Sequence, residues 1–303
     1  MKFIIQKIID LYPTHLIPQN KTLRFFFKII YFSIRNFFSS PFIIQTSFFK
    51  IYAYPKKKES ASIYFRGFHE FDFIKKINHL YKVNSRILFL DIGANVGNNT
   101  LAAAKHYHNI ECHSFEPSPK YFYQLNENIK LNNLNNVKTY NFCIGQNNSE
   151  IDFFVDLNNP GGSTAHENHL SFHPNLLKPK FEKIKTKVKS LDFFLNDINT
   201  NDFNNFFMKI DVEGNEKYVL EGAANFINKH SPDMILEIEE RNFADSFDIS
   251  QKLISLSNQG YFFYKNFTDE VNIKDDLKIF FDYIEKKKHF HFDYFISKKK
   301  HVF

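Results

Sequence analysis

The stretch between residues 86 and 104 constrains the fold of this chain more than any other part of its sequence. An apolar run of strand length at residues 87–92 leads directly into the turn DIGANVG at residues 91–97. Asn98 or Asn99 is then placed to cap a helix that continues through three consecutive alanines. A buried strand, a glycine-containing turn and a helix in this order are typical of a parallel sheet covered by helices.

Short apolar runs and helical stretches keep alternating beyond this unit, which indicates further strand–helix repeats. Ser118 suits the N-cap of a helix, and Pro119 suits its first turn, where a missing N–H has no consequence. Gly260 is expected to end a later helix in the left-handed conformation. The sequence predicts strands at 110–116, 137–142, 150–155 (an edge strand), 184–188, 206–212 and 234–239, helices at 119–132, 216–228 and up to 259, a short helix capped by Ser190, and a closing strand pair at 261–264 and 294–296.

Composition limits the class of protein. The chain has 303 residues, 43% of them hydrophobic, so it can bury a substantial core and is not a disordered protein. We expect one large α/β domain with additions. The net charge of +6 would suit nucleic acid or an anionic membrane, but lysine, asparagine and isoleucine are abundant along the whole chain. Because this general bias explains much of the charge, we do not expect nucleic acid to be the partner.

The cysteines and the N-terminal segment bear on the compartment. Cys112 and Cys143 both lie in apparent strands, at a spacing that indicates neither a disulfide framework nor a metal site. Lys7 and Asp10 interrupt any signal-peptide core, and four basic residues interrupt the apolar segment 23–54. We therefore predict a cytoplasmic protein without a membrane span.

Residues 1–64 form a basic, aromatic leader in which apolar side chains recur every three or four positions, so we predict that the leader is helical. Two roles stay open for residues 1–60. Either the helices pack over the core, which we favour, or their Lys and Arg side chains contact the headgroups of an anionic membrane. The second role would place the protein peripherally at the inner membrane face.

The turn at residues 91–97 is the first candidate binding site. Gly93 and Gly97 frame three residues, so the G-x-G-x-x-G pattern that binds a pyrophosphate is absent and a dinucleotide fits poorly. Glycines here would let a ligand approach the backbone closely. Asp91 makes the mouth of the sheet electronegative, which suits the cationic sulfonium and amino groups of S-adenosylmethionine.

Glu116 ends the second predicted strand and is the natural partner of this turn. An acceptor-only carboxylate at that position can accept hydrogen bonds from both hydroxyls of a ribose, a role that NAD sites and S-adenosylmethionine sites share. Taken singly, the turn and the acid are also explained by an ordinary tight turn and an exposed charge at a strand end. Their spacing along the chain favours a nucleoside-binding site.

The second candidate site is the segment MKIDVEG at residues 208–214, which ends in two acids and a glycine before a helix. Ligands of open α/β sheets bind at this end of the strands. Asp211 and Glu213 are separated by one residue, and on an extended segment such side chains point to the same side. We therefore expect both carboxylates to share a cleft with Asp91, one orienting the methyl donor and the other accepting a proton.

A loop rich in Asn, Gly, His and Pro extends from about residue 158 to 179 and is long enough to form a lid. It carries His166, His169 and His173, whose spacings of three and four would suit zinc. No cysteine or acid completes such a site, and loop histidines are usually exposed, so we predict no metal. His166 stays a candidate proton acceptor.

Three segments make the sequence resemble the FkbM family of S-adenosylmethionine-dependent methyltransferases. They are FLDIGANVGNNT at 89–100, SFEPSPKYFYQLNENI at 114–129 and MKIDVEGNEKYVLEGA at 208–223. Shorter pieces follow in the family's order at residues 144–145, 161–163, 190–192 and 235–237. The resemblance covers about residues 65–240.

The resemblance implies a fold and a division of the chain. The fold is α/β, a Rossmann-like class I methyltransferase fold whose mostly parallel seven-stranded sheet carries helices on both faces. The chain then divides into the leader at residues 1–64, a methyltransferase core at 65–265, and a closing strand with a basic tail at 266–303.

The resemblance also implies an activity and its residues. The activity is O-methylation, commonly of a sugar, glycan or other hydroxylated metabolite, with S-adenosylmethionine as cofactor. Asp211, Glu213 and Gly214 would line the reaction centre, with Asp211 also touching the cofactor. The other cofactor-binding residues would be Asp91, Gly93, Asn95, Gly97 and Glu116.

Methyl transfer from a sulfonium is an in-line displacement, so alignment of donor and acceptor supplies much of the acceleration without a metal. A hydroxyl acceptor must lose a proton, and Glu213 is the first candidate base, followed by His166. Two alternatives stay open: an NAD-linked oxidoreductase on the same kind of sheet, and a non-catalytic module docked to a membrane through the leader. RNA methylation is disfavoured because residues 211–213 lack the proline–aromatic arrangement suited to a flipped base.

Overall fold

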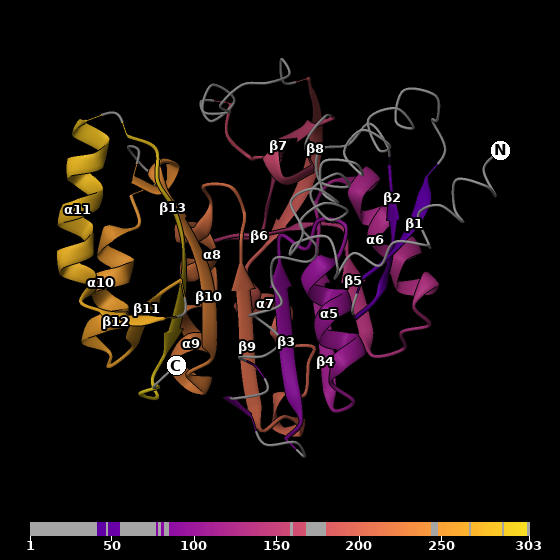
Figure 1. The fold of residues 1–303 in the computed structure, drawn as a ribbon, viewed down its shortest axis with the longest axis horizontal. Coiled ribbons are helices and arrows are strands. Elements are labelled where there is room, and N and C mark those ends of the chain that lie inside the picture. Colours follow the sequence, from indigo (N-terminus) through magenta and orange to yellow (C-terminus); the bar gives the residue numbers. More distant parts are fainter. Residues whose placement is uncertain are drawn as a thin grey trace, which may run out of the picture.

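The computed structural model describes residues 41–46, 48–54, 77, 80–81, 85–157, 160–167, 180–243, 248–266, 268–286 and 288–301. A twisted eight-stranded sheet forms the centre of this part of the chain (Figure 1). From one edge to the other its strands are β12 (Asp269–Val271), β11 (Phe262–Lys265), β13 (His291–Ser297), β10 (Asp233–Glu239), β9 (Asn205–Ile210), β3 (Ile87–Ile92), β4 (Ile110–Phe115) and β5 (Val137–Tyr140).

The sheet is mostly parallel, and the predicted Rossmann-like α/β class is confirmed. Strands β10, β9, β3, β4 and β5 pair in parallel, whereas β13 runs antiparallel between β10 and β11. The predicted closing pair is also confirmed, with Phe263 opposite Ile296. The sheet has eight strands and not seven, because β12 adds a short antiparallel edge to β11. Its sequence, Asp-Glu-Val, carries no alternating pattern that would have predicted a strand.

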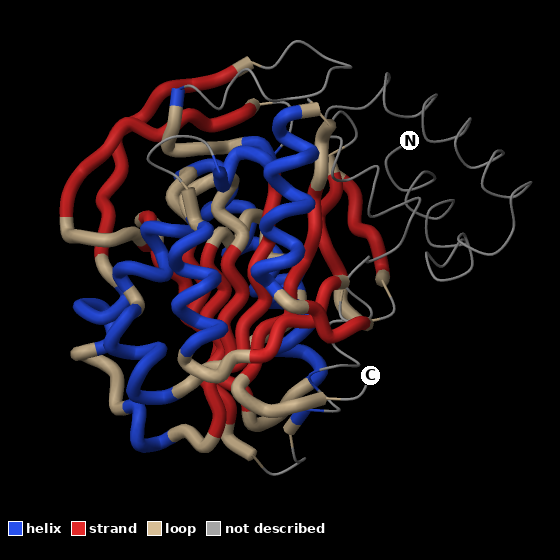
Figure 2. The backbone as a smooth tube through the Cα atoms, turned by 90° about the vertical axis from the view of Figure 1, so that its left-hand side faces the viewer, coloured by secondary structure: helices blue, strands red, loops and turns tan. Residues whose placement is uncertain are grey.

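Helices cover both faces of the sheet and can be followed in Figure 2. On β3, Ile87 and Phe89 belong to one buried cluster, which includes residues of α5 (Asn98–His106) and α6 (Pro119–Leu131). Leu88, Leu90 and Ile92 belong to the cluster on the other face. That face is covered by α7 (Leu191–Leu195), α8 (Glu216–Gly222), α9 (Ala224–His230), α10 (Ser250–Asn258) and α11 (Ile273–Glu285). Such two-sided burial explains why β3 reads as an uninterrupted apolar run.

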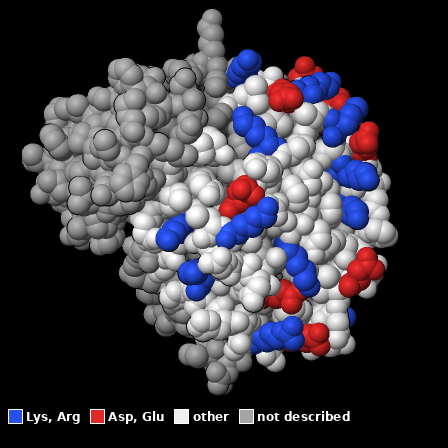
Figure 3. Space-filling model, turned by 90° about the vertical axis from the view of Figure 1, so that its right-hand side faces the viewer, with Lys and Arg blue, Asp and Glu red and all other residues white. Residues whose placement is uncertain are grey.

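A face of the described surface, shown in Figure 3, carries positive and negative side chains interspersed with one another. The described part of this face is therefore not the one-sign basic surface on which nucleic-acid binding depends. In the ranges that the structure describes, no helix is long and apolar enough to cross a membrane.

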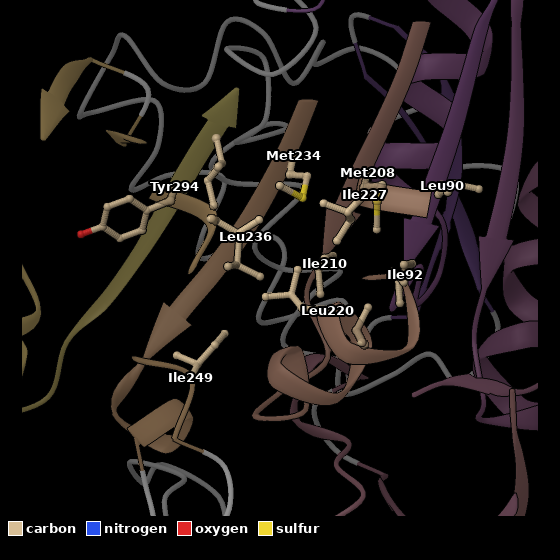
Figure 4. Packing of buried hydrophobic residues seen from close by; sticks show 14 of the residues in the cluster. Leu90, Ile92, Met208, Ile210, Leu220, Ile227, Met234, Leu236, Ile249 and Tyr294 are labelled. Carbon is tan, nitrogen blue, oxygen red and sulfur yellow. The ribbon is translucent and has the colours of Figure 1, made fainter. Parts of the chain in front are cut away.

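The buried cluster that contains Leu88, Leu90 and Ile92 also surrounds the strands that lead to the candidate site (Figure 4). Met208 and Ile210 of β9 and Leu236 of β10 have no exposed surface, and they meet Leu220 of α8 and Ile227 of α9. A close-packed interior of this kind fixes the ends of the strands in place. The side chains that follow β9 and β10 are therefore held in fixed positions.

Helix ends confirm two predicted caps and correct one. Ser118 caps α6 by accepting a hydrogen bond from Tyr121 N, and Ser190 caps α7 by accepting one from Phe193 N. The predicted asparagine cap of α5 is wrong, because Gly97 is the N-cap, at φ +98° and without a side-chain hydrogen bond.

The helix predicted at residues 216–228 is two helices, α8 and α9, which separate at Ala223. Gly222 lies against another part of the chain at this break, since a Cβ there would come within 1.9 Å of Gly145 O. After α10, Gly260 adopts the predicted left-handed conformation, at φ +87°. Helix α11 was not predicted, because residues 266–303 were assigned only a closing strand and a tail.

A second sheet, with the strand order β6-β8-β7, stands beyond the carboxyl ends of the central strands (Figure 1). Its strands are β6 (Cys143–Ile144), β8 (Phe181–Lys189) and β7 (Ser149–Asp156). The prediction that residues 150–155 form an edge strand is confirmed. Of the predicted lid, residues 158–159 and 168–179, with His169 and His173, lie outside the described residues.

The leader is not helical where the structure describes it. Strands β1 (Phe42–Gln45) and β2 (Lys50–Ala53) form an antiparallel hairpin. Tyr52 N donates to Asn128 Oδ1 of α6 at 2.9 Å, and Asn132, the C-cap residue of this helix, pairs with both backbone groups of Lys50. Because asparagines of α6 satisfy the outer edge of β2, the hairpin is part of the core. Residues 1–40 and 55–64 lie outside the described residues.

Candidate active site

A cavity of about 800 Å³ lies at the carboxyl ends of β3, β4, β9 and β10, below the second sheet. Its wall includes most of the residues that the sequence predicted. These are Gly93, Asn95, Glu116, His166, Asp211 and Glu213.

Asp91 lies behind the wall of the cavity and not on it. Its side chain is completely buried, and its Oδ2 accepts a hydrogen bond of 2.5 Å from Thr100 Oγ1. Thr100 Oγ1 also lies 2.7 Å from Ser114 Oγ, so Asp91 links β3, α5 and β4. Burial raises the pKa of Asp91, and the Lys209 ammonium opposes that rise. We expected Asp91 to share a cleft with Asp211 and Glu213, but Asp91 is not among the residues that line the described cavity. Direct contact between Asp91 and a ligand stays a prediction.

The two glycines of the turn serve close contacts within the chain. A Cβ on Gly93 would lie 1.8 Å from Asp211 O, so the turn after β3 and the segment after β9 touch through their backbones. A Cβ on Gly97 would lie 2.5 Å from Leu125 Cδ1 on α6. Both residues have positive φ, which suits glycine. The expected reason for these glycines was ligand approach, and Gly97 does not line the described cavity.

Glu116 and Asn95 form a polar notch in the cavity wall. Glu116 Oε2 accepts a hydrogen bond from Asn95 N at 2.9 Å, and Glu116 Oε1 accepts one from Ser118 N at 2.8 Å. These two bonds fix the carboxylate and leave each oxygen a further lone pair toward the cavity. Burial raises the pKa of Glu116 to about 7.

The polar atoms of this notch suit the adenosyl ligand that the sequence predicts. Asn95 Oδ1 is buried and has no hydrogen-bond partner among the described residues. A buried amide oxygen without a partner is unfavourable, and a ligand N–H would satisfy it. Phe142 and Pro117 add apolar surface to the same wall. The notch therefore offers acceptors for a ribose and an amine beside surface for a flat base.

The segment after β9 turns sharply and does not stay extended as predicted. Glu213 has φ +54° and Gly214 has φ +104°. Glu216, at the start of α8, holds this turn because its carboxylate accepts hydrogen bonds from Val212 N at 2.9 Å and Gly214 N at 3.1 Å. Asp211 and Glu213 still reach the same cavity because the turn, not strand alternation, directs them there.

Each of these two carboxylates has a cationic partner. Lys209 Nζ lies 2.6 Å from Asp211 Oδ2. Burial acts against the charged form of Asp211, but the Lys209 ammonium, which also donates a hydrogen bond to it, lowers its pKa to about 2. Arg241 donates to Glu213 and also to Glu239, at 2.7 Å. Burial raises the pKa of Glu213 well above its ordinary value, and Arg241 opposes that rise.

His166 lies where the described part of the lid meets the turn after β9. Its Nε2 donates to Asn215 Oδ1 at 2.6 Å, and the nearby Thr164 Oγ1 donates to Glu213 O at 3.1 Å. Burial lowers the pKa of His166, so the imidazole is neutral near pH 7. This arrangement suits a proton acceptor.

Sequence reasoning assigned no role to three charged side chains of the candidate site: Lys209, Glu237 and Arg241. Glu237 and Lys209 line the cavity, and Arg241 lies just after β10 in the short helix η5 (Glu240–Phe243). Glu237 had a usable signal, because β10 is the parallel neighbour of β9 and its carboxyl end must lie beside Asp211. Arg241 had none, since an isolated arginine after a strand is ordinarily a surface residue.

Oxygen atoms of Asp211, Glu213 and Glu237 lie within 4.8 Å of one another, which is close enough to surround a cation. Lys209 and Arg241 already pair with two of these three carboxylates. Protein cations therefore supply the positive charge that a metal ion would bring, and we assign no metal to this group.

Comparisons with known proteins point to one family. The family model described as Methyltransferase FkbM domain matches residues 91–263, which include both the notch and the turn after β9. No curated protein matches the chain.

Similar solved structures include a methyltransferase FkbM from Methylobacillus flagellatus KT, with 16% identity, a TM-score of 0.38, and coverage of 59% of this chain and 39% of that one. A precorrin-6y C5,15-methyltransferase from Geobacter metallireducens GS-15 has 11% identity, a TM-score of 0.40, and coverage of 78% and 89%. M. jannaschii TYW2 in complex with AdoMet has 12% identity, a TM-score of 0.37, and coverage of 86% and 87%. With the first structure, the match spans about two fifths of the other protein's length. These scores are too low to carry an argument about activity.

Proposed function

Because the chain belongs to the FkbM methyltransferase family, we propose that it transfers a methyl group from S-adenosylmethionine to a hydroxyl group of a sugar, glycan or similar metabolite. Family membership favours methyl transfer over the NAD-linked alternative. The observation that carries the acceptor side of the proposal is the group of three carboxylates beside the Glu116 notch. Carboxylates accept hydrogen bonds from hydroxyl groups, and one of them can take the proton that the reaction releases.

The notch residues would hold the cofactor. Glu116 would accept hydrogen bonds from the ribose hydroxyls, and the buried Oδ1 of Asn95 would accept one from an N–H of the ligand. Gly93 lines the same cavity, while Asp91 and Gly97 act through the turn that they support. When bound, S-adenosylmethionine supplies an electrophilic methyl group on a sulfonium.

The acids after β9 would hold and deprotonate the acceptor. Asp211, kept ionised beside Lys209, attracts the sulfonium and orients the acceptor hydroxyl. Glu213 is the proposed general base, because burial brings the affinity of its carboxylate for a proton closer to that needed near pH 7. His166, neutral and half-buried beside the same turn, is the second candidate.

Calorimetric titration with S-adenosylmethionine tests the donor half of the proposal. Wild-type protein should bind, Glu116→Ala should lose binding, and Asp91→Ala should weaken it by loosening the turn. Lys138→Ala, on the exposed end of β5, is a matched surface control that should bind like wild type. Wild-type protein that does not bind the cofactor would contradict the proposal.

Labelling identifies the acceptor. Cell extracts supplied with methyl-labelled donor, with and without the enzyme, should differ in one fraction, and alkali-stable label on a hydroxylated compound would support O-methylation. Label on an amine or on carbon would contradict it.

The location of the protein in the cell is a separate part of the proposal. We propose a cytoplasmic protein, with residues 1–40 as the segment that would touch an anionic inner membrane face. Because the hairpin of β1 and β2 packs on α6, a deletion should stop before residue 41. Binding to anionic vesicles that survives this deletion would contradict a membrane role for residues 1–40.

A further inference from the structure

Glu237 lies at the centre of the acids of the candidate site. It lies in β10, lines the cavity, and has a carboxylate oxygen within 4.8 Å of one of Asp211, which follows the parallel neighbour β9. Two carboxylates this close repel each other when both are charged, which favours retention of one proton by the pair. The geometry therefore favours a proton on the pair of Asp211 and Glu237 in the ligand-free site.

The surroundings of the pair decide which carboxyl carries it. Lys209 Nζ is 2.6 Å from Asp211 Oδ2 and stabilises the charged form of that residue. On the solvent side, Glu237 Oε1 lies 3.1 Å from Nε2 of His291, whose side chain is 60% exposed. The charged and titratable groups around Glu237 are Lys209, Asp211 and Glu213 from β9 and the turn after it, Glu239 and Arg241 from β10 and η5, and His291 and Asp293 from β13.

The pKa directions agree with this assignment. Burial, followed by the charge of the neighbouring Asp211 carboxylate, raises the pKa of Glu237 well above its ordinary value. The pKa of Asp211 is lowered to about 2. The shared proton thus belongs to Glu237, as in other carboxyl pairs whose charges cannot both be accommodated.

We propose that Glu237 is a further residue of the reaction centre, which holds this proton in the ligand-free enzyme and releases it to solvent when S-adenosylmethionine binds. The inference rests on the proposed function. A carboxylic acid and a cationic ligand become a carboxylate, a bound cation and a free proton, so the charge in the cavity does not change. Binding of the donor would thereby prepare a second carboxylate, next to Asp211, for the hydroxyl of the acceptor.

Proton release can be counted without knowing the acceptor. The enthalpy of S-adenosylmethionine binding is measured near pH 7 in buffers of different ionisation enthalpy, and its slope gives the protons released per ligand. Glu237→Gln should release about one proton fewer than wild type, since only this carboxyl is removed. Glu116 contributes equally to both proteins. Equal release by the two proteins would overturn the proposal.

His291→Gln is the matched control. It removes the exposed imidazole that contacts Glu237 and leaves both carboxyls in place, so its proton release should equal that of wild type. If release were lost in His291→Gln instead, the proton would come from the imidazole and the proposal would be wrong.

Wild-type protein provides a test that does not depend on the folding of a variant. Since the proton competes with the cationic ligand, affinity for S-adenosylmethionine should weaken by up to about tenfold per pH unit as pH falls. Binding with no proton release and no change between about pH 6 and 8 would overturn the role of Glu237 while leaving the proposed function intact. Absence of binding would contradict the proposed function itself.

Discussion

Replacement of Gly93 by alanine tests how the site is assembled. Gly93 has φ +86°, and a Cβ at this position would lie 1.8 Å from Asp211 O, a backbone atom that cannot rotate away. The left-handed conformation disfavours an L-residue by about 1–2 kcal/mol. Forcing the turn and the segment after β9 apart adds about 1–3 kcal/mol, as overpacking does elsewhere. We expect Gly93→Ala to lower the free energy of unfolding by about 2–5 kcal/mol.

Gly260→Ala separates the two contributions. Gly260 has nearly the same φ, +87°, but an added Cβ there meets nothing within 4 Å. This variant should therefore lose only about 1–2 kcal/mol, from backbone conformation alone. Urea unfolding of both variants gives the difference, which measures the contact between the two segments. Calorimetry should show weakened S-adenosylmethionine binding for Gly93→Ala and unchanged binding for Gly260→Ala.

Two results would refute this reasoning. Equal losses of stability in the two variants would mean that the backbones after β3 and β9 do not touch as described. Full cofactor affinity in Gly93→Ala would mean that the spacing of these segments does not shape the notch.

Three further predictions concern the framework around the site. Asn128→Ala should lower the free energy of unfolding by about 1–3 kcal/mol and speed amide exchange at Tyr52, because Tyr52 N and Val96 O both lose their partner; unchanged exchange would contradict this. Arg241→Met should lower it by about 3–5 kcal/mol in urea unfolding, since two largely buried carboxylates lose their cation; a loss under 1 kcal/mol would show that these ion pairs are dispensable. Burial raises the pKa of the Glu216 carboxyl from 4.5 to about 7. Between these values the folded protein holds a proton that the unfolded chain has lost, so the stability that this group contributes falls as pH rises from about 4.5 to about 7. In thermal unfolding across that range, the free energy of unfolding should fall with pH less steeply in Glu216→Gln than in wild type, by about 1.4 kcal/mol per pH unit. Equal slopes in the two proteins would refute the prediction.

Local signals predicted the repeating core of the fold well. The cap at Ser118 and the apolar run before Gly93 depend on neighbours a few positions away, so the sequence around them was enough. The hairpin of β1 and β2 was not predictable from local signals, because the backbone groups at its edge bond to Asn128 and Asn132, about 80 positions later. A bond of that range leaves no periodic mark on either segment.

In the candidate site, too, some residues follow from local signals and others depend on distant parts of the chain. Glu116 was predictable because its position at a strand end and its distance from Gly93 follow from the βαβ repeat. Arg241 and Glu237 were missed because their importance comes from the charges that neighbouring strands bring beside them. Asp91 shows what the motif alone does not predict: its side chain is buried behind the cavity wall and bonded to Thr100, while its contact with a ligand stays a prediction.

The position of β13 has a consequence for synthesis of the protein. This strand lies between β10 and β11 although more than 50 residues separate it from β10. Until the ribosome has released residues 291–297, Met234, Leu236 and their neighbours remain an open, apolar sheet edge to which other nascent chains can add. Premature stop codons between residues 240 and 290 should therefore yield aggregates and not a shortened soluble protein.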